Sequence, residues 1–266
     1  MTTDKLSIHS IPVSSIEGDT FLMEKAVALA KRLHLNHVPL VNLTDHNAIL
    51  VYTEKGLQIQ LKQNKNNKSH VTLHVDFLSD SLNYRRQHGG GIKQALARAV
   101  GVKPGKRPSI LDVTAGLGKD SFLLASLGCK VRMIERSLIL GALLYDGLER
   151  AEKSQYFKEI INSKLTLSQG DAIAIMNTDC HKIYDTIYLD PMYPHSGKSA
   201  LNKQELRIIR KLVGDDTDSD KLLDTALISA KKRAVVKRPK GAPLLNSVSP
   251  THTIKMKNSR YDVYMI

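Results

Sequence analysis

Hydrophobic positions in the first third of the chain follow two different spacings. Over Phe21–Leu35 they recur at helical intervals, which predicts a helix with Thr20 as its N-cap. Farther along, in the runs Leu57–Leu61 and Val71–Val75, apolar and polar residues alternate, which predicts strands. A polar turn separates these two runs, so the strands are expected to pair in a small antiparallel sheet. The first part of the chain is therefore expected to be a separate α+β unit.

A second pattern begins after His88-Gly89-Gly90-Gly91, where the glycines predict a hinge. A helix over Ile92–Val100 is expected to end at Gly101. Beyond it, compact apolar runs alternate with helical spacings, which predicts a parallel, doubly wound sheet with a closing antiparallel hairpin at the C-terminus. The expected strands are 110–113, 131–134, 165–167, 183–189 and 234–236; the expected helices are 121–127, 138–151, 203–213 and 221–230; the hairpin joins 251–257 to 261–266.

The length of 266 residues allows one large domain plus a smaller appendage. We expect the small α+β domain at residues 1–84 and the α/β domain at residues 85–266. Hydrophobic residues make up 42% and charged residues 24% of the chain, a composition typical of globular proteins that leaves little room for long disordered tracts.

The charge of the chain favours a polyanionic partner. There are 39 Lys and Arg residues against 26 Asp and Glu residues, for a formal net charge of +13. Nucleic acid comes first among such partners. A basic surface that only aids solubility is the alternative, because net charge identifies no site.

The two cysteines, Cys129 and Cys180, do not belong to any Cys/His cluster with metal-ligand spacing. We therefore expect no disulfide framework and no metal site. The N-terminal residues lack a basic segment that leads into an apolar run, and the longest apolar stretches, such as Leu138–Leu144, are too short to span a bilayer. A cytoplasmic protein without a membrane segment is expected.

The most informative turn follows the first strand of the α/β domain, in the segment Leu111–Asp120. Gly116 and Gly118 remove Cβ atoms where a ligand approaches the backbone, and the following helix N-terminus offers N–H groups to an anionic group of a nucleotide or an amino acid. Ser121 stands where a dinucleotide-binding fingerprint has its third glycine or alanine, which disfavours a nicotinamide cofactor. Asp112 and the Thr-Ala pair before the glycines instead resemble the first motif of class I methyltransferases, which bind S-adenosylmethionine (SAM).

Acidic residues also end the next two strands of the expected sheet. Glu135 follows Val131–Ile134, where a carboxylate can accept hydrogen bonds from both hydroxyls of a ribose. Asp171 follows the third strand, and in the methyltransferase pattern an acid at this place pairs with the exocyclic amine of adenine. Asp171 is an equally good candidate for the N-cap of the next helix, and the two roles are compatible.

The strand at 183–189 leads directly into Asp190-Pro191-Met192-Tyr193-Pro194-His195. This segment resembles the Asn/Asp-Pro-Pro-Tyr/Phe motif of enzymes that methylate exocyclic amino groups of bases, with Met192 in place of the second proline. The lone pair of such an amine is delocalised into the ring, so acceptors for its N–H groups, here Asp190 and the carbonyl of Pro191, help to localise and aim it. Tyr193 can stack on the extracted base, an attraction of about 1–3 kcal/mol.

Two residues of this motif also have simpler interpretations. Asp190 could be a turn residue ahead of a proline. His195 could relay the departing proton, or it could be a structural or phosphate contact, as a loop histidine often is.

Several segments taken together resemble one family, the RsmJ-type guanine-N2 methyltransferases of bacterial small-subunit (16S) ribosomal RNA. The resemblance runs from about Asp76 to the C-terminus, and the residues before it add little signal. It implies a Rossmann-like class I methyltransferase fold, SAM as the methyl donor, and N2-methylguanosine in 16S rRNA or the small ribosomal subunit as the product. The segments that carry it are Asp112–Asp120, Met133–Arg136, Tyr188–His195, Lys198–Leu201 and Val235–Pro239.

The same resemblance implies which residues hold the cofactor. Glu135, Asp171 and Asp190 also follow from the residue patterns, whereas Lys119 and Arg136 rest on the resemblance. We predict Asp190, Pro191 and Tyr193 as the catalytic residues. The predicted cofactor site consists of Asp112, Gly116, Gly118, Lys119, Asp120, Glu135, Arg136, Gly170, Asp171 and Asp190.

Basic residues near these motifs fit an RNA substrate, because phosphate contacts position an RNA without reading its sequence. Lys231-Lys232-Arg233, beside the fifth strand, belongs to this group. Each residue could equally belong to a solvated face. The predicted substrate contacts are Arg85, Arg86, His88, His195, Lys198, Lys237 and Arg238.

Three other functions are compatible with parts of the pattern. An amino-methyltransferase that acts on another RNA or on DNA adenine would share the motifs. A nicotinamide-dependent oxidoreductase would share the fold but leaves Asp-Pro-Met-Tyr unexplained. A non-catalytic RNA-binding or assembly factor is expected to have lost Asp190 or the glycine loop, and this chain keeps both. The sequence carries no signal for an oligomeric state.

Overall fold

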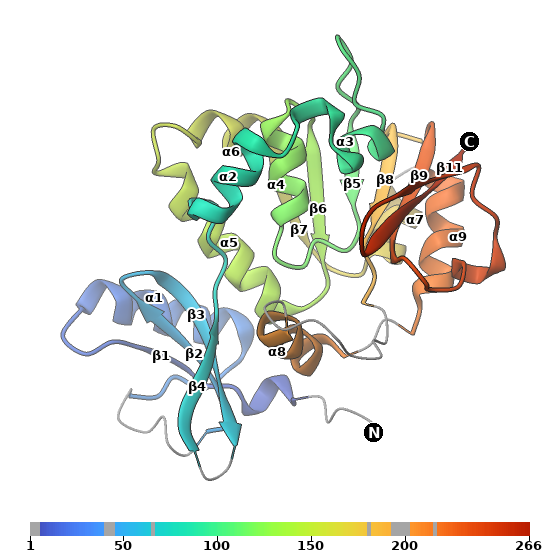
Figure 1. Ribbon diagram of the computed structural model, residues 1–266. Coiled ribbons are helices and arrows are strands. Elements are labelled where there is room, and N and C mark those ends of the chain that lie inside the picture. Colours follow the sequence, from blue (N-terminus) through green and yellow to red (C-terminus); the bar gives the residue numbers. More distant parts are fainter. Residues whose placement is uncertain (1–5, 40–45, 65–66, 180–181, 193–202, 215–216) are drawn as a thin grey trace. The chain divides into compact units, whose positions relative to one another are not determined.

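The computed structural model of the protein (Figure 1) describes the chain except residues 1–5, 40–45, 65–66, 180–181, 193–202 and 215–216. Its contacts divide the chain into two compact units, and the first contains two segments from the middle of the sequence. The domain boundary after residue 84 stays a prediction. The first unit comprises Met1–Asp76, Ser137–Arg150 and Ser196–Gly214; the second comprises Phe77–Arg136, Ala151–His195 and Asp215–Ile266.

The first unit is built on a four-stranded sheet with the order β1-β2-β3-β4. β3 and β4 pair antiparallel, as the alternating pattern predicts. β2 also pairs antiparallel with β3, whereas β1 runs parallel to β2. Asp19 caps α1 by accepting a hydrogen bond from the Leu22 N–H (3.0 Å), so the prediction of Thr20 as the cap is wrong. The elements are η1 (Ile8–Ser10), β1 (Val13–Ser15), α1 (Thr20–Leu33), β2 (Ala48–Thr53), β3 (Gly56–Asn64), β4 (Asn67–Leu73), α8 (Lys203–Val213) and, up to Arg150, α5 (Leu138–Glu152).

α5 is held in the first unit by a buried carboxylate. Asp146 accepts hydrogen bonds from the backbone N–H of Leu57 (2.9 Å) and from Nε of Arg150 (2.8 Å). Gly147 lies so close to Val75, two residues after the end of β4, that a Cβ on Gly147 would stand 2.6 Å from the side chain of Val75. A helix that the sequence assigns to the α/β domain therefore packs on the N-terminal sheet.

The second unit contains a seven-stranded sheet with the order β10-β11-β9-β8-β5-β6-β7. Five adjacent strands, from β9 to the edge strand β7, are parallel, and β11 runs antiparallel to both β9 and β10. This arrangement confirms the predicted α/β fold with a closing hairpin. The strand order reverses at β5, and ligands of such sheets bind outside the carboxyl ends of the strands at that point. The strands are β5 (Ile110–Asp112), β6 (Val131–Glu135), β7 (Leu165–Gln169), β8 (Thr186–Leu189), β9 (Arg233–Pro239), β10 (His252–Lys255) and β11 (Ser259–Met265).

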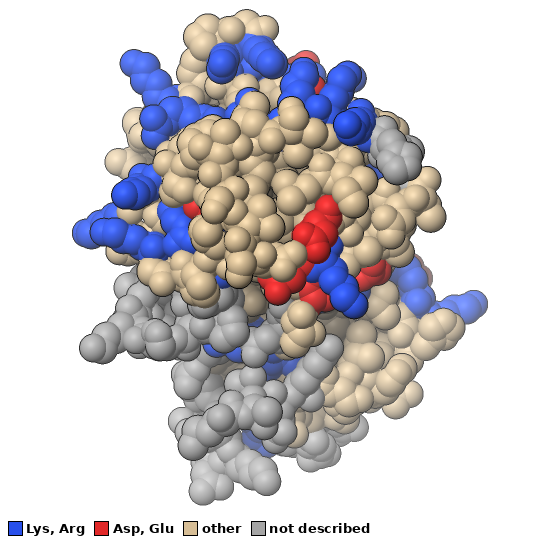
Figure 2. Space-filling view, turned by 90° about the vertical axis from the view of Figure 1, so that its right-hand side faces the viewer, with Lys and Arg blue, Asp and Glu red and all other residues tan. Residues whose placement is uncertain are grey.

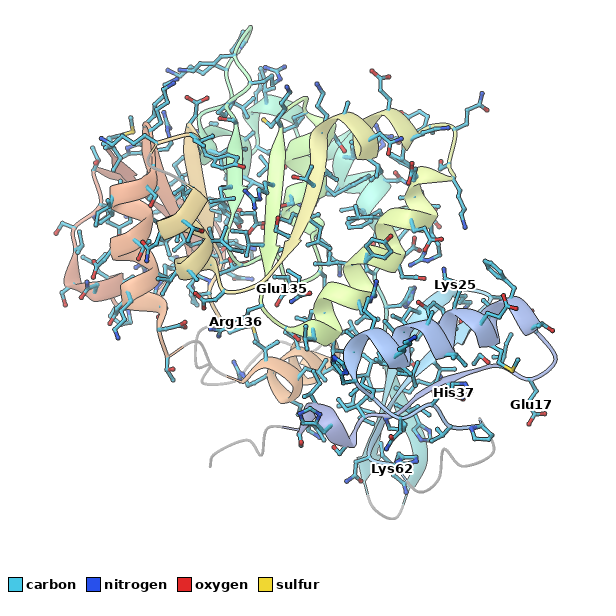
Figure 3. All side chains as sticks on the ribbon, turned by 180° about the vertical axis from the view of Figure 1, so that it is seen from behind. Glu17, Lys25, His37, Lys62, Glu135 and Arg136 are labelled. Carbon is cyan, nitrogen blue, oxygen red and sulfur yellow. The ribbon has the colours of Figure 1, made fainter. Side chains whose placement is uncertain are left out.

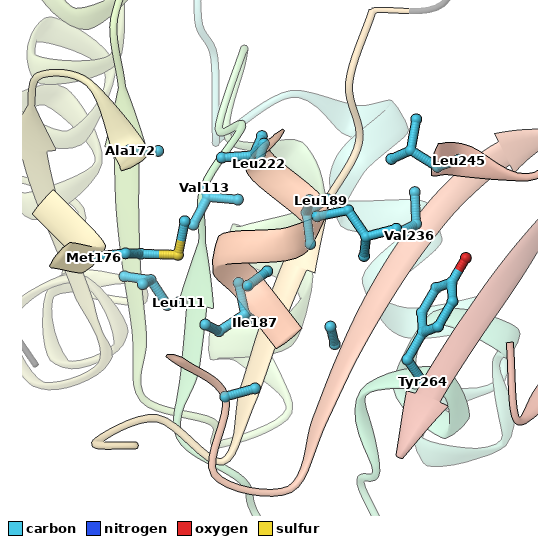
Figure 4. Close-up of a cluster of buried hydrophobic side chains, with 14 of the residues drawn as sticks. Leu111, Val113, Ala172, Met176, Ile187, Leu189, Leu222, Val236, Leu245 and Tyr264 are labelled. Carbon is cyan, nitrogen blue, oxygen red and sulfur yellow. The ribbon is translucent and has the colours of Figure 1, made fainter. Parts of the chain in front are cut away.

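Helices cover both faces of this sheet. On one face, α7 and α9 pack against the strands through a buried apolar cluster that includes Leu111, Ile187 and Leu222 (Figure 4). On the other face, α3 and α4 lie over the sheet, and Phe122 of α4 stacks on Phe77 with ring centroids 5.1 Å apart. The helices of this unit are α2 (Asp80–His88), η3 (Gly91–Lys93), α3 (Ala95–Val100), α4 (Lys119–Ser126), α6 (Lys158–Lys164), α7 (Ala172–Asp179), α9 (Ser219–Ser229) and η4 (Leu245–Ser247).

Some local predictions differ from the structure. The predicted helix at 92–100 is two short helices, η3 and α3, although Gly101 ends the second one in the left-handed conformation as expected (φ 89°). The strand predicted at 183–189 begins only at Thr186. The glycine run that predicts a hinge lies inside the second unit, directly after α2. α2 was not predicted from the sequence, because Leu82 is its only buried residue and the helix has no apolar periodicity. None of the described helices is long and apolar enough to cross a bilayer.

Candidate active site

Four acidic residues stand at the carboxyl ends of four neighbouring parallel strands. Asp112 ends β5, Glu135 ends β6, Asp171 follows β7 and Asp190 follows β8. Because the carboxyl ends of parallel strands share one edge of a sheet, the fold gathers these predicted site residues at that edge. Figure 3 shows Glu135 and its neighbour Arg136 at the end of β6.

The glycine loop after β5 is shaped by its backbone and by the carboxylate below it. Gly116 (φ 57°) and Gly118 (φ 69°) adopt the left-handed conformation, which favours glycine. Asp112 is buried, and its carboxylate accepts hydrogen bonds from the Thr114 N–H (3.1 Å) and from the hydroxyl of Ser121. Burial raises the pKa of Asp112 to about 7. Asp112 therefore orders the loop from inside the protein.

Glu135 connects three loops of the site. Its side chain is only 5% exposed, and Oε2 accepts a hydrogen bond from the Gly116 N–H (2.9 Å). Its backbone carbonyl accepts hydrogen bonds from the Gly170 N–H (3.0 Å) and from Nε2 of Gln169 (2.6 Å). The carboxylate therefore lies directly beside the glycine turn.

Asp171 is the N-cap of α7. Its Oδ1 accepts a hydrogen bond from the Ala174 N–H (2.8 Å), which confirms the capping interpretation. The residue is exposed, and its contact with the cofactor stays a prediction. The preceding Gly170 has φ 149°, and a Cβ there would stand 3.2 Å from the side chain of Ile175.

Lys237 of β9 lies between two carboxylates of the site. Its Nζ is 2.8 Å from Oδ2 of Asp190 and 3.0 Å from Oδ2 of Asp120, in the first turn of α4. Burial alone would lower the pKa of Lys237, but the charges of Asp190 and Asp120 outweigh it and raise that pKa above its usual range. Lys237, which the sequence suggested as an RNA contact, is therefore a cation held inside the site.

Asp120 is itself anchored from several sides. It accepts hydrogen bonds from the buried hydroxyl of Tyr188 (2.8 Å) and from Arg85 (3.0 Å). Burial would raise the pKa of Asp120, but the charges of Lys237 and Arg85 outweigh it and lower the pKa to about 2. This carboxylate is therefore ionised throughout the physiological range.

Asp190 is fixed through its backbone as well as its side chain. Its N–H donates to Oγ1 of Thr114 (2.6 Å), which joins the segment after β8 to the glycine loop, while the side chain remains 40% exposed. Beside Pro191 and Met192 lies a cavity of about 460 Å³, within the usual range for small-ligand pockets. The rest of its wall comes from Ser219, Asp220, Arg238, Pro243, Leu244, Leu245, Asn246 and Ser247.

Several predicted site residues make protein contacts of their own. Arg136 forms an ion pair with Asp218 (3.0 Å) at the start of α9. The guanidinium of Arg86 lies over Tyr156, 4.9 Å from the ring centroid. Arg238 is buried and donates to the carbonyl of Pro243 (2.9 Å). His88 packs against the exposed ring of Tyr84 (4.6 Å between centroids), and Lys119 is exposed at the start of α4. Tyr193, His195 and Lys198 lie outside the described residues.

Two residues of the site were not singled out from the sequence. Thr114 belongs to the Thr-Ala pair of the glycine-loop motif, but no role was predicted for its hydroxyl. Tyr188 lies inside a buried strand, where nothing in the sequence distinguishes it from a core aromatic. Among the described residues, no group of three or more His, Cys, Asp or Glu side chains could hold a metal ion.

Comparison with known proteins agrees with this geometry. The family model described as "Putative SAM-dependent methyltransferase" matches residues 28–266. The chain belongs to this family. The methyltransferase is similar to the protein named ribosomal RNA small subunit methyltransferase J of Desulfotalea psychrophila, with 43% identity over 97% of this chain and 98% of the relative. The protein of the same name from Pseudoalteromonas atlantica is 47% identical over 92% of this chain and 94% of its own length.

A solved structure supports the fold of the methyltransferase. The crystal structure of a SAM-dependent methyltransferase from Neisseria gonorrhoeae is 32% identical, with a TM-score of 0.70 over 96% of this chain and 95% of that one. The Rossmann-like class I fold and the use of SAM, both expected from the sequence, are therefore confirmed.

Proposed function

We propose that the enzyme transfers the methyl group of SAM to the exocyclic N2 amine of a guanosine in small-subunit (16S) ribosomal RNA. The names of relatives that are 43% and 47% identical over almost their whole length support the RNA substrate. The observation that carries the reaction is Asp190, which stands at the carboxyl end of β8 with its backbone held by Thr114 and its carboxylate by Lys237. Such a substrate puts the activity in the cytoplasm.

The residues at the carboxyl edge fit SAM. The buried Glu135 carboxylate beside Gly116 suits a ribose with two hydroxyl donors. The left-handed glycine turn leads into the N-terminus of α4, where backbone N–H groups suit an anionic group such as a carboxylate. Asp171, exposed at the next strand end, can accept from the adenine amine. When bound, SAM supplies a methyl group attached to a positively charged sulfur, and that sulfur becomes a neutral thioether when the methyl group is transferred.

Asp190 is the acceptor for the target amine. Its carboxylate, with the carbonyl of Pro191, binds the two N–H groups of the amine and directs the nitrogen lone pair toward the methyl group. The N–C bond forms as the S–C bond breaks, the sulfur keeps the bonding electrons, and the amine then releases one proton. Lys237 acts as a positioning residue, because its charge fixes the orientation of Asp190.

The cavity beside Pro191 and Met192 is the proposed place of the extracted base. Tyr193 is proposed to stack on that base. Arg85 and His88 on α2, with His195 and Lys198, are proposed to contact the RNA backbone. Arg86 and Arg238 are not expected to contact the RNA, because Arg86 packs on Tyr156 and Arg238 is buried.

The test uses labelled SAM and small-subunit rRNA, free or in particles, from cells that lack the activity, followed by nucleoside analysis. N2-methylguanosine at one site supports the proposal, whereas methyladenine, or transfer only to another RNA or to DNA, contradicts it. The variant Asp190→Ala is expected to abolish transfer while SAM binding remains; undiminished transfer would rule out the proposed role of Asp190.

A further inference from the structure

Lysine and arginine side chains gather at the edge of the seven-stranded sheet that faces away from the acidic site. Parallel strands begin at that amino edge, and the loops that lead into β5, β6, β8 and β9 all carry basic residues. Six of these residues are exposed: Lys103, Lys106, Arg107, Lys130, Lys182 and Lys231, which we call the amino-edge surface.

Backbone hydrogen bonds show that these loops lie side by side. The Ile110 N–H donates to the carbonyl of Lys130 (2.8 Å), the Thr186 N–H donates to that of Ser109 (3.1 Å), and the Lys231 N–H donates to that of Tyr184 (2.9 Å). The surface therefore crosses four adjacent strands, a width of about 14 Å at the usual strand spacing. In Figure 1 the segment between α3 and β5 projects beyond the sheet, and Figure 2 shows Lys and Arg side chains gathered at the top of the molecule.

The charges at the two edges are arranged differently. At the carboxyl edge the cations Arg85, Lys237 and Arg136 each pair with a carboxylate. At the amino edge, Asp185 is paired with Lys232 (2.5 Å). Within the described part of the chain, no carboxylate forms an ion pair with any of the six residues of the amino-edge surface. Arg107 donates hydrogen bonds to the backbone carbonyls of Lys103 and Lys106, and the charge of Lys231 contributes to lowering the pKa of Asp185. None of the six has an ion-pair partner among the described residues, so their charge is available to an anion.

We propose that the amino-edge surface binds the phosphate backbone of a second segment of the substrate RNA, separate from the segment that carries the target guanosine. The proposal rests on the proposed function, which makes the enzyme's partner an RNA. An array of exposed cations without ion-pair partners fits phosphates in particular, because neutralising the phosphates releases their bound counterions.

The position of the surface determines what kind of RNA can use it. Along β9, Arg233 at the amino end is four residues from Lys237 at the site, about 13 Å of strand, and the two edges face opposite directions. We therefore expect an RNA substrate long enough for a second segment to lie across the amino edge while the target base enters the site.

The test compares two triple variants that remove equal charge from exposed positions. Lys106→Gln/Lys130→Gln/Lys231→Gln alters the amino-edge surface, and Lys55→Gln/Lys158→Gln/Lys221→Gln is the control from other parts of the chain. Binding to protein-free small-subunit RNA is measured without SAM at several salt concentrations. The amino-edge variant is expected to bind at least about tenfold more weakly than the control, with a salt slope smaller by about 2, at unchanged melting temperature and SAM affinity.

Equal affinities and salt slopes for the two triple variants would overturn the proposal. A loss confined to particles that contain ribosomal proteins would also overturn it, because the surface would then contact protein. Methyl transfer is measured separately. If RNA binding depends on the amino-edge lysines but the unaltered enzyme transfers no methyl group, only the proposed reaction is contradicted. If the enzyme transfers the methyl group but the two triple variants bind RNA equally well, only the second RNA contact is contradicted.

Discussion

The ammonium group of Lys237 lies 2.8 Å from a carboxylate oxygen of Asp190 and 3.0 Å from one of Asp120. These partners are 47 and 117 residues away in the sequence, and each comes from a different strand end or helix start. Tyr188 and Arg85 hold Asp120 on its other sides. The segment after β8 and the first turn of α4 are thus connected by one half-buried cation.

Lys237→Met is expected to lower kcat about 100-fold and to leave the affinity for SAM within about threefold. The reason is that a charge-assisted hydrogen bond of roughly 1.5–3 kcal/mol, which orients Asp190, is lost. The acidic limb of the kcat profile is expected to move to higher pH, because removing the cation favours protonation of the carboxylates that it faces. Steady-state kinetics across pH, with SAM binding by calorimetry, checks this.

Lys237→Arg is the matched control, because it keeps the charge with a different geometry. It is expected to restore part of kcat and the position of the acidic limb. If Lys237→Met only lowers the melting temperature, and the acidic limb stays where it is in the unaltered enzyme, Lys237 has a structural role alone.

Gly116→Ala is expected to weaken SAM binding at least about tenfold, while Gly18→Ala leaves it unchanged. Both glycines are left-handed, with φ 57° and 81°, and neither has a heavy atom within 3.4 Å of an added Cβ, so both variants are expected to cost about 1–2 kcal/mol of stability. Only Gly116 donates its N–H to Glu135. Chemical denaturation and SAM titration measure the two effects, and equal SAM affinities would refute a role of the turn in cofactor binding.

Asp171→Asn separates the two roles of Asp171. Asn caps helices as well as Asp does, so stability is expected to stay within about 0.5 kcal/mol, whereas Asp171→Ala is expected to lose about 1 kcal/mol. Both variants are expected to weaken SAM binding, because Asn replaces an acceptor-only carboxylate with a mixed donor and acceptor. Full SAM affinity in Asp171→Asn would leave Asp171 as a cap only.

The buried Asp112 is expected to make stability depend on pH. Its pKa in the folded protein is raised to about 7, so between about pH 4 and 7 the native state holds a proton that the unfolded chain has released. This group therefore lowers the free energy of unfolding by up to about 1.4 kcal/mol per pH unit as pH rises through that window. The stability of the unaltered protein relative to Asp112→Asn should fall from pH 4 to 7 in urea titrations; parallel curves would show that Asp112 is already ionised at pH 4.

Much of the candidate active site follows from local sequence features. The glycine turn, Glu135 and the Asp190 segment were all recognisable, because each directly follows a buried strand whose apolar run marks the strand end. α2 and β1 were missed, since α2 buries only Leu82 and β1 is three residues long, too short for a periodic pattern. The cap of α1 was misplaced by one residue because Asp19 and Thr20 are both good capping types.

The roles of the basic residues did not follow from the sequence. Lys237 and Arg238 are adjacent basic residues, and both were predicted to contact RNA. Successive side chains of a strand point to opposite faces, so Lys237 joins the acidic site and Arg238 is buried against Pro243. Arg86 likewise packs on Tyr156, which lies 70 residues farther along the chain.

The fold class, the cofactor and the residues at the strand ends could therefore be predicted from local patterns, because hydrophobic period, glycine conformation and short motifs act over a few neighbouring residues. The partners of Lys237, the place of α5 and α8 in the first unit, and the gathering of six basic residues at the amino edge became visible only in the folded chain. These depend on strand order and packing, which bring together side chains that are far apart in the chain.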